Sequence, residues 1–483
     1  MRDRTGSDAP GDRDPDGPAG DARRGQPDAP SVDLARRRFF RSFGREALQT
    51  AAQIVSAAAV LQRNSFAATS QLLSGSTDPD DPIGQLPGTE AAPSKPVPPA
   101  TPFRSPYRYR EGEVTLVDQR RLPGELVEVV CHTGPEIAAS IRGGVVRGGP
   151  VLGQVAAYGV LLAAERTRAS GEFIRAATLH GTINALRSAR AASRIMEVAL
   201  DRVLGAWQAV GETAPGDAVV DAIRAEAQAI ADEAMLVHAA IGRAGAAVLP
   251  SPIDRRLEVL VHGPVGPLGG GMLGTAVAVL HELRVQGRDV HVWVPEERPS
   301  FHGARITAFE LARFEIAHTV TSDAAVGSLI ARGRVDAVLL GAERIARNGD
   351  LSAAIGTYPI AAVAARHDVP VYVTAPLRTL DAGAADGWQF AAEEGTVDEL
   401  ADVNGRRVPP GESLVFNPTL DVTPAALVRG FVTEAGVLAA PFEPTLAAAL
   451  HGPGAAGPRR AAGRTRASGA GPGTAVSSRT APD

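Results

Sequence analysis

The sequence predicts an α/β protein in which a helical part is followed by a parallel β-sheet. From residue 135 to 248 the pattern is helical, with abundant alanine and a long amphipathic run at 216–241. After residue 257, short apolar runs typical of strands alternate with helical segments, which indicates βαβ units. The strand-like runs are 257–261, 290–294, 335–340 and 369–373, and the helical segments are 272–286, 303–313, 323–332 and 352–366.

The two ends of the chain differ from its middle in composition. Residues 1–33 are rich in Asp, Gly, Pro and Arg and hold few apolar side chains. Such a segment cannot bury enough surface to offset the entropy cost of ordering, so we expect it to be disordered. Residues 451–483, rich in Gly, Ala and Arg, are expected to behave in the same way. The proline-rich stretch 74–106 is expected to be a linker.

An amphipathic helical segment is predicted at 34–73, between the first tail and the linker. It contains Arg36-Arg37 within RRRFFR, which resembles a twin-arginine export motif. A signal segment needs 7–15 consecutive apolar residues, and here polar residues such as Arg45 and Glu46 interrupt the run. The favoured interpretation is therefore a helix that docks on a partner protein, on the chain itself or on a membrane surface, in a cytoplasmic protein. Export stays an alternative.

The body of the chain is expected to contain two domains. Strands at 114–118 and 126–132 open it, and a mainly helical domain is predicted at 107–250. An α/β domain is predicted at 251–450. Ligands of parallel sheets bind where the strands end and the helices begin, so the chemistry is expected at those strand ends.

Composition excludes several functional classes. The chain has 483 residues and a net charge of −5, which argues against a broad basic surface, and no nucleic-acid partner is expected. Cys131 is the only cysteine, which excludes internal disulfides and cysteine-based metal clusters. Lys95 is the only lysine and lies in the proline-rich stretch, so lysine-based chemistry is not expected.

Three strand ends carry residues suited to chemistry. The stretch 262–271 is rich in glycine, so its backbone N–H groups either approach an anion or form a tight structural turn. After the next strand, Arg298 and Arg305 either grip a phosphate or pair with Glu296 and Glu297.

The third strand end places Glu343 directly after the most apolar run, within Gly-Ala-Glu-Arg. A carboxylate in this position is either a general acid/base or half of a structural ion pair. Spacing alone does not separate the two.

A series of short motifs runs in order between about residues 114 and 438. The motifs are LVDQRRLP (116–123), VRGGP (146–150), AYG (157–159), ERP (297–299), HGARITA (302–308), GAERI (341–345), NGD (348–350), IGTY (355–358) and NPTLDVTP (417–424). Together they resemble the family of 5-methylthioribose-1-phosphate isomerases, whose fold is shared by ribose-1,5-bisphosphate isomerase and by the regulatory subunits of translation initiation factor 2B.

The resemblance implies a fold and a reaction. The fold is a small helical N-terminal domain followed by a Rossmann-like parallel-sheet C-terminal domain, usually assembled as a homodimer. The reaction converts a ring-closed sugar 1-phosphate into an open-chain ketose. It needs an acid/base pair across the ring oxygen, C1 and C2, and a phosphate cradle. The resemblance therefore implies a sugar-phosphate ligand, no cofactor and no metal.

The chain departs from the family pattern at several positions of the expected site. The family's cysteine, the asparagine after it, its general-acid aspartate, a glutamine and an Asn-Lys pair are here Gly263, Pro264, Glu343, His302 and Ala353-Ala354. The family's N-domain arginine has no clear match near 180–184. Loss of the cysteine removes a functional group, whereas Asp to Glu keeps the carboxylate and moves it outward by one methylene.

These residues define a candidate site. The predicted catalytic residue is Glu343, with His302 or His262 as a second proton carrier because histidine titrates near neutral pH. Each histidine could instead be an ordinary loop residue. The predicted substrate-binding residues are Arg147, Gly148, Gly149, Arg298, Arg305 and Asp350.

Two functions stay open. The first is an isomerase of the methionine-salvage type, an intramolecular oxidoreductase acting on a sugar 1-phosphate. The alternative is a non-catalytic protein of the initiation factor 2B type that senses a sugar phosphate or nucleotide, since one fold can host both. Convergence of Glu343, His262, His302 and Arg147 on one cavity would favour the enzyme.

Overall fold

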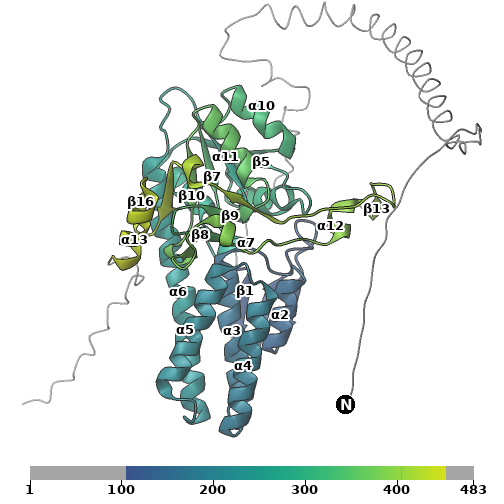
Figure 1. Cartoon of the computed structure of the whole chain (residues 1–483), viewed down its shortest axis with the longest axis vertical. Coiled ribbons are helices and arrows are strands. Elements are labelled where there is room, and N and C mark those ends of the chain that lie inside the picture. The colour runs from purple at the N-terminus through teal and green to yellow at the C-terminus, as the bar shows by residue number, and fades with distance from the viewer. Residues whose placement is uncertain (1–104, 404, 453–483) are drawn as a thin grey trace, which may run out of the picture. The chain divides into compact units, whose positions relative to one another are not determined.

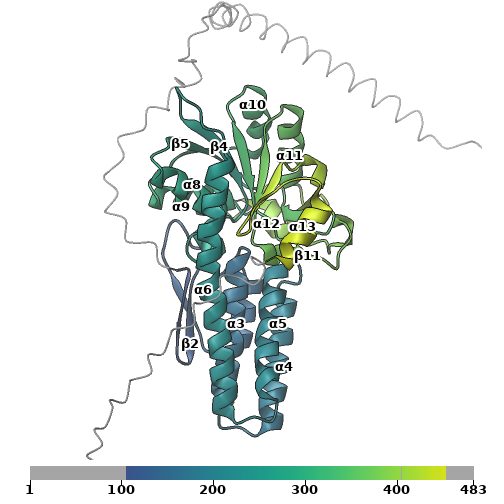
Figure 2. The same cartoon turned by 90° about the vertical axis from the view of Figure 1, so that its left-hand side faces the viewer.

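The computed structural model describes residues 105–403 and 405–452 (Figures 1 and 2). The predictions for 1–33, for 34–73 and for nearly all of 74–106 and 451–483 lie outside these described residues. Within the described ranges, no helix is long and apolar enough to cross a membrane.

A small antiparallel sheet opens the described chain. It has the order β1-β2-β3, formed by Tyr107–Arg110, Glu113–Val117 and Glu128–Cys131. Val114 and Leu116 of β2 are fully buried, which matches the alternation that predicted a strand here.

Five helices follow. They are α2 (Gly134–Arg142), α3 (Pro150–Arg166), α4 (Glu172–Ala189), α5 (Arg194–Val210) and α6 (Gly216–Val248). Helix α3 is buried along nearly its whole length, as expected for a helix that is apolar on all sides. Figure 2 shows α6 running past the other helices to the large sheet, where it packs against α8 (Ala276–Val285).

The large sheet has seven strands in the order β16-β15-β10-β7-β4-β5-β6, and every neighbouring pair except β15–β16 is parallel. The strands are β4 (Leu257–His262), β5 (Val290–Pro295), β6 (Ala317–Thr321), β7 (Ala337–Leu340), β10 (Val371–Thr374), β15 (Gly430–Thr433) and β16 (Gly436–Leu438). Successive strands lie on one side of β4 up to β6, and then on its other side from β7 onward. This reversal between β4 and β7 is the topological switch point of a doubly wound sheet. The predicted α/β fold class with a Rossmann-like parallel sheet is confirmed.

Helices cover both faces of this sheet. One buried cluster joins it to α6, α8 and α9 (Ala308–Arg313). The other joins it to α10 (Val326–Ala331), α11 (Thr357–Arg366) and α13 (Phe442–His451). The strand-like runs of the sequence are mostly apolar because both faces of their sheet are covered by helices.

A second, four-stranded sheet lies beside the carboxyl ends of the large one and has the order β11-β8-β9-β14. Its strands are Leu380–Asp381, Arg344–Ala346, Leu351–Ala354 and Leu420–Thr423. The prediction of one helix over 352–366 is wrong at its start. Residues 351–354 pair antiparallel with β14 and β8, and α11 begins only at Thr357, after the left-handed turn at Gly356. Pairing with a distant strand overrides the local helical preference of alanine here.

Short elements complete the described chain. They are α7 (Pro267–Gly270), α12 (Val397–Ala401), β12 (Asp402–Val403), β13 (Arg406–Arg407), η2 (Gly303–Thr307), η3 (Asp323–Ala325), η4 (Leu377–Thr379), η5 (Gly387–Gln389) and η6 (Ala425–Leu427). Figure 1 shows α12 and β13 on an arm that projects from the second sheet.

Candidate active site

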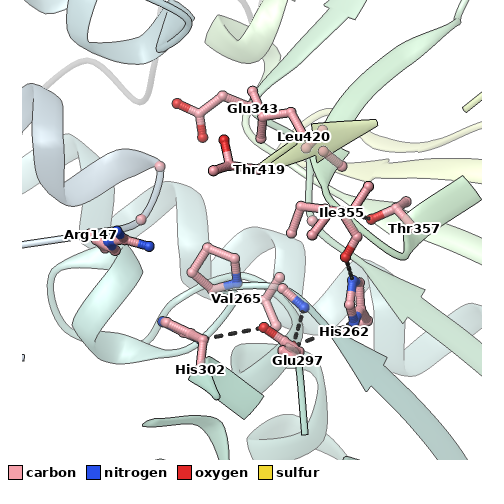
Figure 3. A pocket seen from close by; sticks show the side chains of 18 of the residues that line it. Arg147, His262, Val265, Glu297, His302, Glu343, Ile355, Thr357, Thr419 and Leu420 are labelled. Carbon is pink, nitrogen blue, oxygen red and sulfur yellow. Dashed lines mark hydrogen bonds and ion pairs between the residues drawn. The ribbon is translucent and has the colours of Figure 1, made fainter. Parts of the chain in front are cut away.

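A cavity of about 110 Å³ lies at the carboxyl ends of β4 and β7, against the start of α3 and the end of α4 (Figure 3). The carboxyl ends of β4 and β7 flank the topological switch point, where ligands of this sheet class bind. Seven of the residues that the sequence nominated line this cavity: Glu343, His262, His302, Arg147, Gly148, Gly149 and Arg298. Arg305 and Asp350 are not among its lining residues.

One wall of the cavity holds a buried carboxylate between two histidines. Glu297 follows β5 with a φ of 60°, in the left-handed region that non-glycine residues rarely adopt. Its Oε1 accepts a hydrogen bond from Gly263 N over 2.7 Å and lies 3.5 Å from His262 Nδ1. Its Oε2 lies 3.6 Å from His302 Nδ1 (Figure 3). Backbone strain held at such a cluster is typical of functional sites.

The contact between Glu297 and His262 requires a proton. His262 Nε2 lies 3.0 Å from the carbonyl oxygen of Ile355, which can only accept, so Nε2 carries a hydrogen. Nδ1 of the same ring then faces a carboxylate oxygen. The carboxylate thus lies next to a ring nitrogen that has no hydrogen-bond partner among the described residues.

Burial shifts the pKa of two side chains of this wall toward their neutral forms. Burial raises the pKa of Glu297, while His262 and the Gly263 N–H oppose that rise. Burial lowers the pKa of His302 to about 3, and the nearby cations Arg147 and Arg305 add to the effect. His302 is therefore neutral at physiological pH, and its imidazole is a weak base in the empty cavity.

Glu343 lies across the cavity from His302 and Glu297 (Figure 3). It precedes β8, is 8% exposed, and its Oε1 lies 3.7 Å from Arg190 Nε. Arg190 also lies 3.3 Å from Glu393, through its Nη2. Burial raises the pKa of Glu343, and Arg190 partly offsets the rise. A buried carboxyl group with a raised pKa is the usual form of a general acid.

The structure thus brings Arg190, which sequence reasoning missed, into the cavity. It lies just after α4, beyond the 180–184 stretch in which the family's arginine was sought. Its neighbours Arg187 and Arg194 look the same in sequence and pair with other carboxylates, Asp201 and Glu197. No local signal separates the three arginines.

Arg147 lies directly before α3, at the positive end of the helix dipole. Its Nη2 lies 3.2 Å from Glu399 Oε1, and 39% of its side chain is exposed. Gly148 has a φ of 124°, and a Cβ atom there would lie 2.3 Å from Gly269 Cα, so only glycine fits. The arrangement provides an arginine and a helix N-terminus at one end of the cavity, the two devices that bind phosphate groups.

The glycine-rich loop does not present its amides to the cavity. Leu268 N donates to the Glu310 carboxylate over 2.6 Å, and the amides of Gly269, Gly270 and Gly271 donate to carbonyls within the loop. The interpretation of this stretch as an anion cradle is therefore wrong for these four amides. Its glycines allow close packing instead, since a Cβ at Gly266 would lie 1.8 Å from Glu310 Oε2.

Arg298 and Arg305 do not pair with the neighbouring glutamates. Arg298 lines the cavity, but its guanidinium donates to the carbonyls of Pro299 and Leu400. Arg305 donates to several carbonyls, those of Gln119 and Leu122 among them, and so ties the first sheet to the α/β region. At Arg305 the structure supports neither of the two roles that the sequence left open, phosphate binding and pairing with a glutamate.

Asp350 has a structural environment. Its carboxylate accepts hydrogen bonds from Asn348 Nδ2 and from the backbone N–H groups of Ala425 and Gly387. It thereby joins loops of the second sheet, away from the cavity. No group of three or more His, Cys, Asp or Glu side chains in residues 105–403 and 405–452 is arranged to hold a metal ion.

Comparison with known proteins identifies the family. The model of the initiation factor 2 subunit family matches residues 145–440. The chain belongs to this family. The resemblance that the motifs indicated is thereby confirmed.

Similar members of the initiation factor 2 subunit family are isomerases. A methylthioribose-1-phosphate isomerase of Caldicellulosiruptor saccharolyticus is 35% identical over 337 residues, which are 70% of this chain and 96% of the relative. One from Thermus thermophilus is 39% identical and covers 72% of this chain and 98% of the relative.

Solved structures agree with this family assignment. The 5-methylthioribose 1-phosphate isomerase of Pyrococcus horikoshii has a TM-score of 0.66 at 30% identity, covering 72% of this chain and 96% of that one. The eIF-2B subunit delta of A. fulgidus has a TM-score of 0.62, also at 30% identity, covering 71% of this chain and 100% of that one.

Proposed function

We propose that this family member is a sugar-phosphate isomerase that converts a ring-closed sugar 1-phosphate of the 5-methylthioribose type into the open-chain ketose. One observation carries the proposal. The cavity holds a buried carboxyl group, Glu343, and on its opposite wall the buried side chains of His302 and Glu297. Arg147, at the start of α3, also lines this cavity. The isomerases similar to this chain cover more than two thirds of it, which supports the same reaction class.

The reaction has three proton requirements. The ring oxygen gains a proton as its bond to C1 breaks, one hydrogen moves from C2 to C1, and the C2 hydroxyl loses its proton. Glu343 is assigned to the ring oxygen, because it lines the cavity and burial raises its pKa, as suits a general acid. His302 is assigned to the C2 side, because its ring lines the cavity and its Nδ1 lies 3.6 Å from Glu297 Oε2, the carboxylate that would stabilise an imidazolium there.

The proposal explains how catalysis could proceed without a side chain at Gly263. That residue contributes its N–H to Glu297 and so fixes the carboxylate between the two histidines. The second proton carrier then comes from His302 rather than from the strand end after β4. The sugar phosphate itself is expected to bind with its phosphate on Arg147, Gly148 and Gly149.

A specific observation favours the non-catalytic alternative. Arg147 and Arg190, the cations best placed to hold a phosphate, each contact a carboxylate of the segment 393–399. A protein that binds sugar phosphates for sensing needs such cations and no proton transfer. The 30% identity to the A. fulgidus eIF-2B subunit delta is compatible with this second function.

One experiment tests both the isomerase and the sensing function. Full-length protein is incubated with 5-methylthioribose 1-phosphate, and formation of the open-chain ketose is followed by NMR. Turnover is expected in the wild type and in Glu296→Gln, a neighbouring carboxylate that does not line the cavity. Turnover is expected to be lost in Glu343→Gln. Binding without turnover in the wild type would replace the isomerase by the sensing function, and absence of both would refute the proposal.

Several further assignments are proposals as well. A homodimer, a cytoplasmic location, a protein partner for the helix at 34–73, and domain boundaries at 107–250 and 251–450 belong with the proposed isomerase. Light scattering of the full chain tests the homodimer. Comparison with a variant lacking residues 34–73 tests the protein partner proposed for that segment.

A further inference from the structure

A second cavity lies between β1, α3 and α6, on the other side of the glycine-rich loop from the candidate active site. Its volume is about 230 Å³, and Tyr107, Tyr109 and Tyr158 are among the residues that line it. A smaller cavity of about 50 Å³ adjoins it, since both are lined by Gln154 and His238. Figure 2 shows α3 and α6 side by side below the sheet.

His238 on α6 is an unpartnered polar group at the junction of these two cavities. It is 1% exposed, and neither ring nitrogen has a hydrogen-bond partner in the described part of the chain. Burial lowers its pKa to about 4, so the ring is neutral and offers one N–H donor and one lone pair. Buried polar groups are normally hydrogen-bonded to protein or to ordered water, so His238 offers a place where a polar ligand can bind.

The walls around His238 are pre-organised. Tyr107 donates to Gln154 Oε1 over 2.9 Å, and Gln154 Nε2 donates to the carbonyl of Gly270 over 2.8 Å. Tyr158 stacks on Tyr109 with ring centroids 4.8 Å apart. These side chains therefore already have defined positions, as expected for a preformed ligand pocket.

Each charged residue of the cavity has a polar or charged partner, which disfavours a charged ligand. Arg108 pairs with Glu128 at 3.5 Å, and Asp232 accepts a hydrogen bond from Gln228 over 2.8 Å. Two exposed methionines, Met235 and Met272, lie among the lining residues. The cavity thus combines aromatic rings, thioethers and one neutral imidazole.

We propose that this cavity binds a neutral, planar nitrogen heterocycle of nucleobase size, which stacks against the tyrosines and hydrogen-bonds to His238. A ring edge that carries an acceptor and a donor complements a neutral imidazole. Aromatic faces favour planar π-systems over aliphatic ligands of equal size. Binding at this cavity does not depend on whether the proposed isomerase activity is correct.

The ligand would act on the candidate active site through the loop that separates them. His238 packs against Gly270, because a Cβ atom placed on Gly270 would lie 3.0 Å from Cε1 of His238. The same loop begins with Gly263 and Val265, which line the candidate active site. Binding on one side is expected to order the loop and to change sugar-phosphate affinity on the other, and the coupling must be reciprocal.

Calorimetric titration of the full chain with adenine and cytosine tests the proposal. Saturable binding of at least one base is expected in the wild type and in the control His367→Leu, an exposed histidine at the end of α11. His238→Leu is expected to weaken that binding at least tenfold. It is also expected to raise the melting temperature of the ligand-free protein, because it removes an unpartnered buried polar group.

A second variant guards against misfolding of the first. Met235 is 43% exposed on α6, so Met235→Trp should leave the melting temperature unchanged while it obstructs the cavity and abolishes binding. Wild-type protein that binds neither base at millimolar concentration would overturn the proposal. So would equal binding by His238→Leu, or a lower melting temperature of that variant without any binding, which would make His238 purely structural.

Discussion

Arg147 Nη2 lies 3.2 Å from Glu399 Oε1, and this ion pair joins the start of α3 to α12 at the cavity. The arginine best placed for a phosphate group thus already contacts a carboxylate from another part of the chain. A phosphate that binds Arg147 must compete with Glu399. Both side chains are partly exposed, so the pair is worth no more than about 1 kcal/mol.

Removal of that competing charge should strengthen anion binding. Glu399→Gln is expected to lower the Kd for inorganic phosphate and for the sugar phosphate by about two- to fivefold, the equivalent of up to about 1 kcal/mol. Calorimetric titration at low salt measures it. Glu412→Gln, on an exposed part of the projecting arm, makes the same change in net charge and serves as the control. An equal effect of the two variants would mean that net charge alone is responsible.

Gly263 should be intolerant of a side chain for conformational reasons. A Cβ atom there has room, since its nearest neighbour would be Ala354 Cβ at 3.8 Å, but the φ of 93° disfavours an L-residue. Gly263→Ala is expected to lower the free energy of unfolding by about 1–2 kcal/mol. Gly181→Ala, on the exposed side of α4, should instead raise it by about 0.5–1 kcal/mol. Urea unfolding measures both, and a neutral Gly263→Ala would contradict the assigned backbone conformation.

The sequence predicted the parallel sheet because its signal is local. The mostly apolar runs 257–261 and 290–294 are typical of strands whose two faces are both buried, and this pattern is visible within each run. The strand at 351–354 could not be predicted in this way, because its alanines favour a helix and its state depends on pairing with residues 420–423. Contacts over long sequence separations are not visible in local composition.

The residues of the candidate site also divide into those that the local sequence could nominate and those whose place depends on contacts over long sequence separations. His262 and Glu343 could be nominated because each lies at or just after a strand end, and Arg147 because it belongs to the VRGGP motif of the family resemblance. Glu297 could not be assigned its place, because sequence proximity suggested Arg298 as partner while the fold turns its carboxylate to two histidines from other elements. The two interpretations of the glycine-rich loop could not be separated, because Glu310, which accepts from Leu268, lies 42 residues further along the chain.

Glu310 should make the protein less stable as the pH rises. It is fully buried, and burial raises its pKa to about 8 from an ordinary value near 4.5. Between these values the folded protein holds a proton that the unfolded chain has released. The free energy of unfolding therefore falls with rising pH across this window, by at most about 1.4 kcal/mol per pH unit.

Glu310→Gln tests that assignment, because the amide oxygen can still accept from Leu268 N. The variant is expected to lose less stability than the wild type between pH 5.5 and 8, as measured by urea unfolding at both values. Glu315→Gln, an exposed carboxylate nearby, should leave the wild-type slope unchanged. Parallel slopes in Glu310→Gln and the wild type would show that Glu310 is ionised in the folded protein.

His302 should make the protein less stable as the pH falls, which is the opposite of the pH effect of Glu310. Its pKa is lowered to about 3 by burial, whereas an unfolded histidine titrates near 6.5. As the pH falls from 6.5 toward 3, the unfolded chain binds a proton that the folded protein excludes, so stability is lost. His302→Gln is expected to reduce that loss between pH 7 and 5, with buried His238 accounting for part of the remainder, while it abolishes isomerase turnover at both values. His367→Gln, at an exposed position, should change neither quantity. If His302→Gln kept the wild-type acid dependence, His302 would be protonated within the fold, and the proton-accepting role proposed for it would fail.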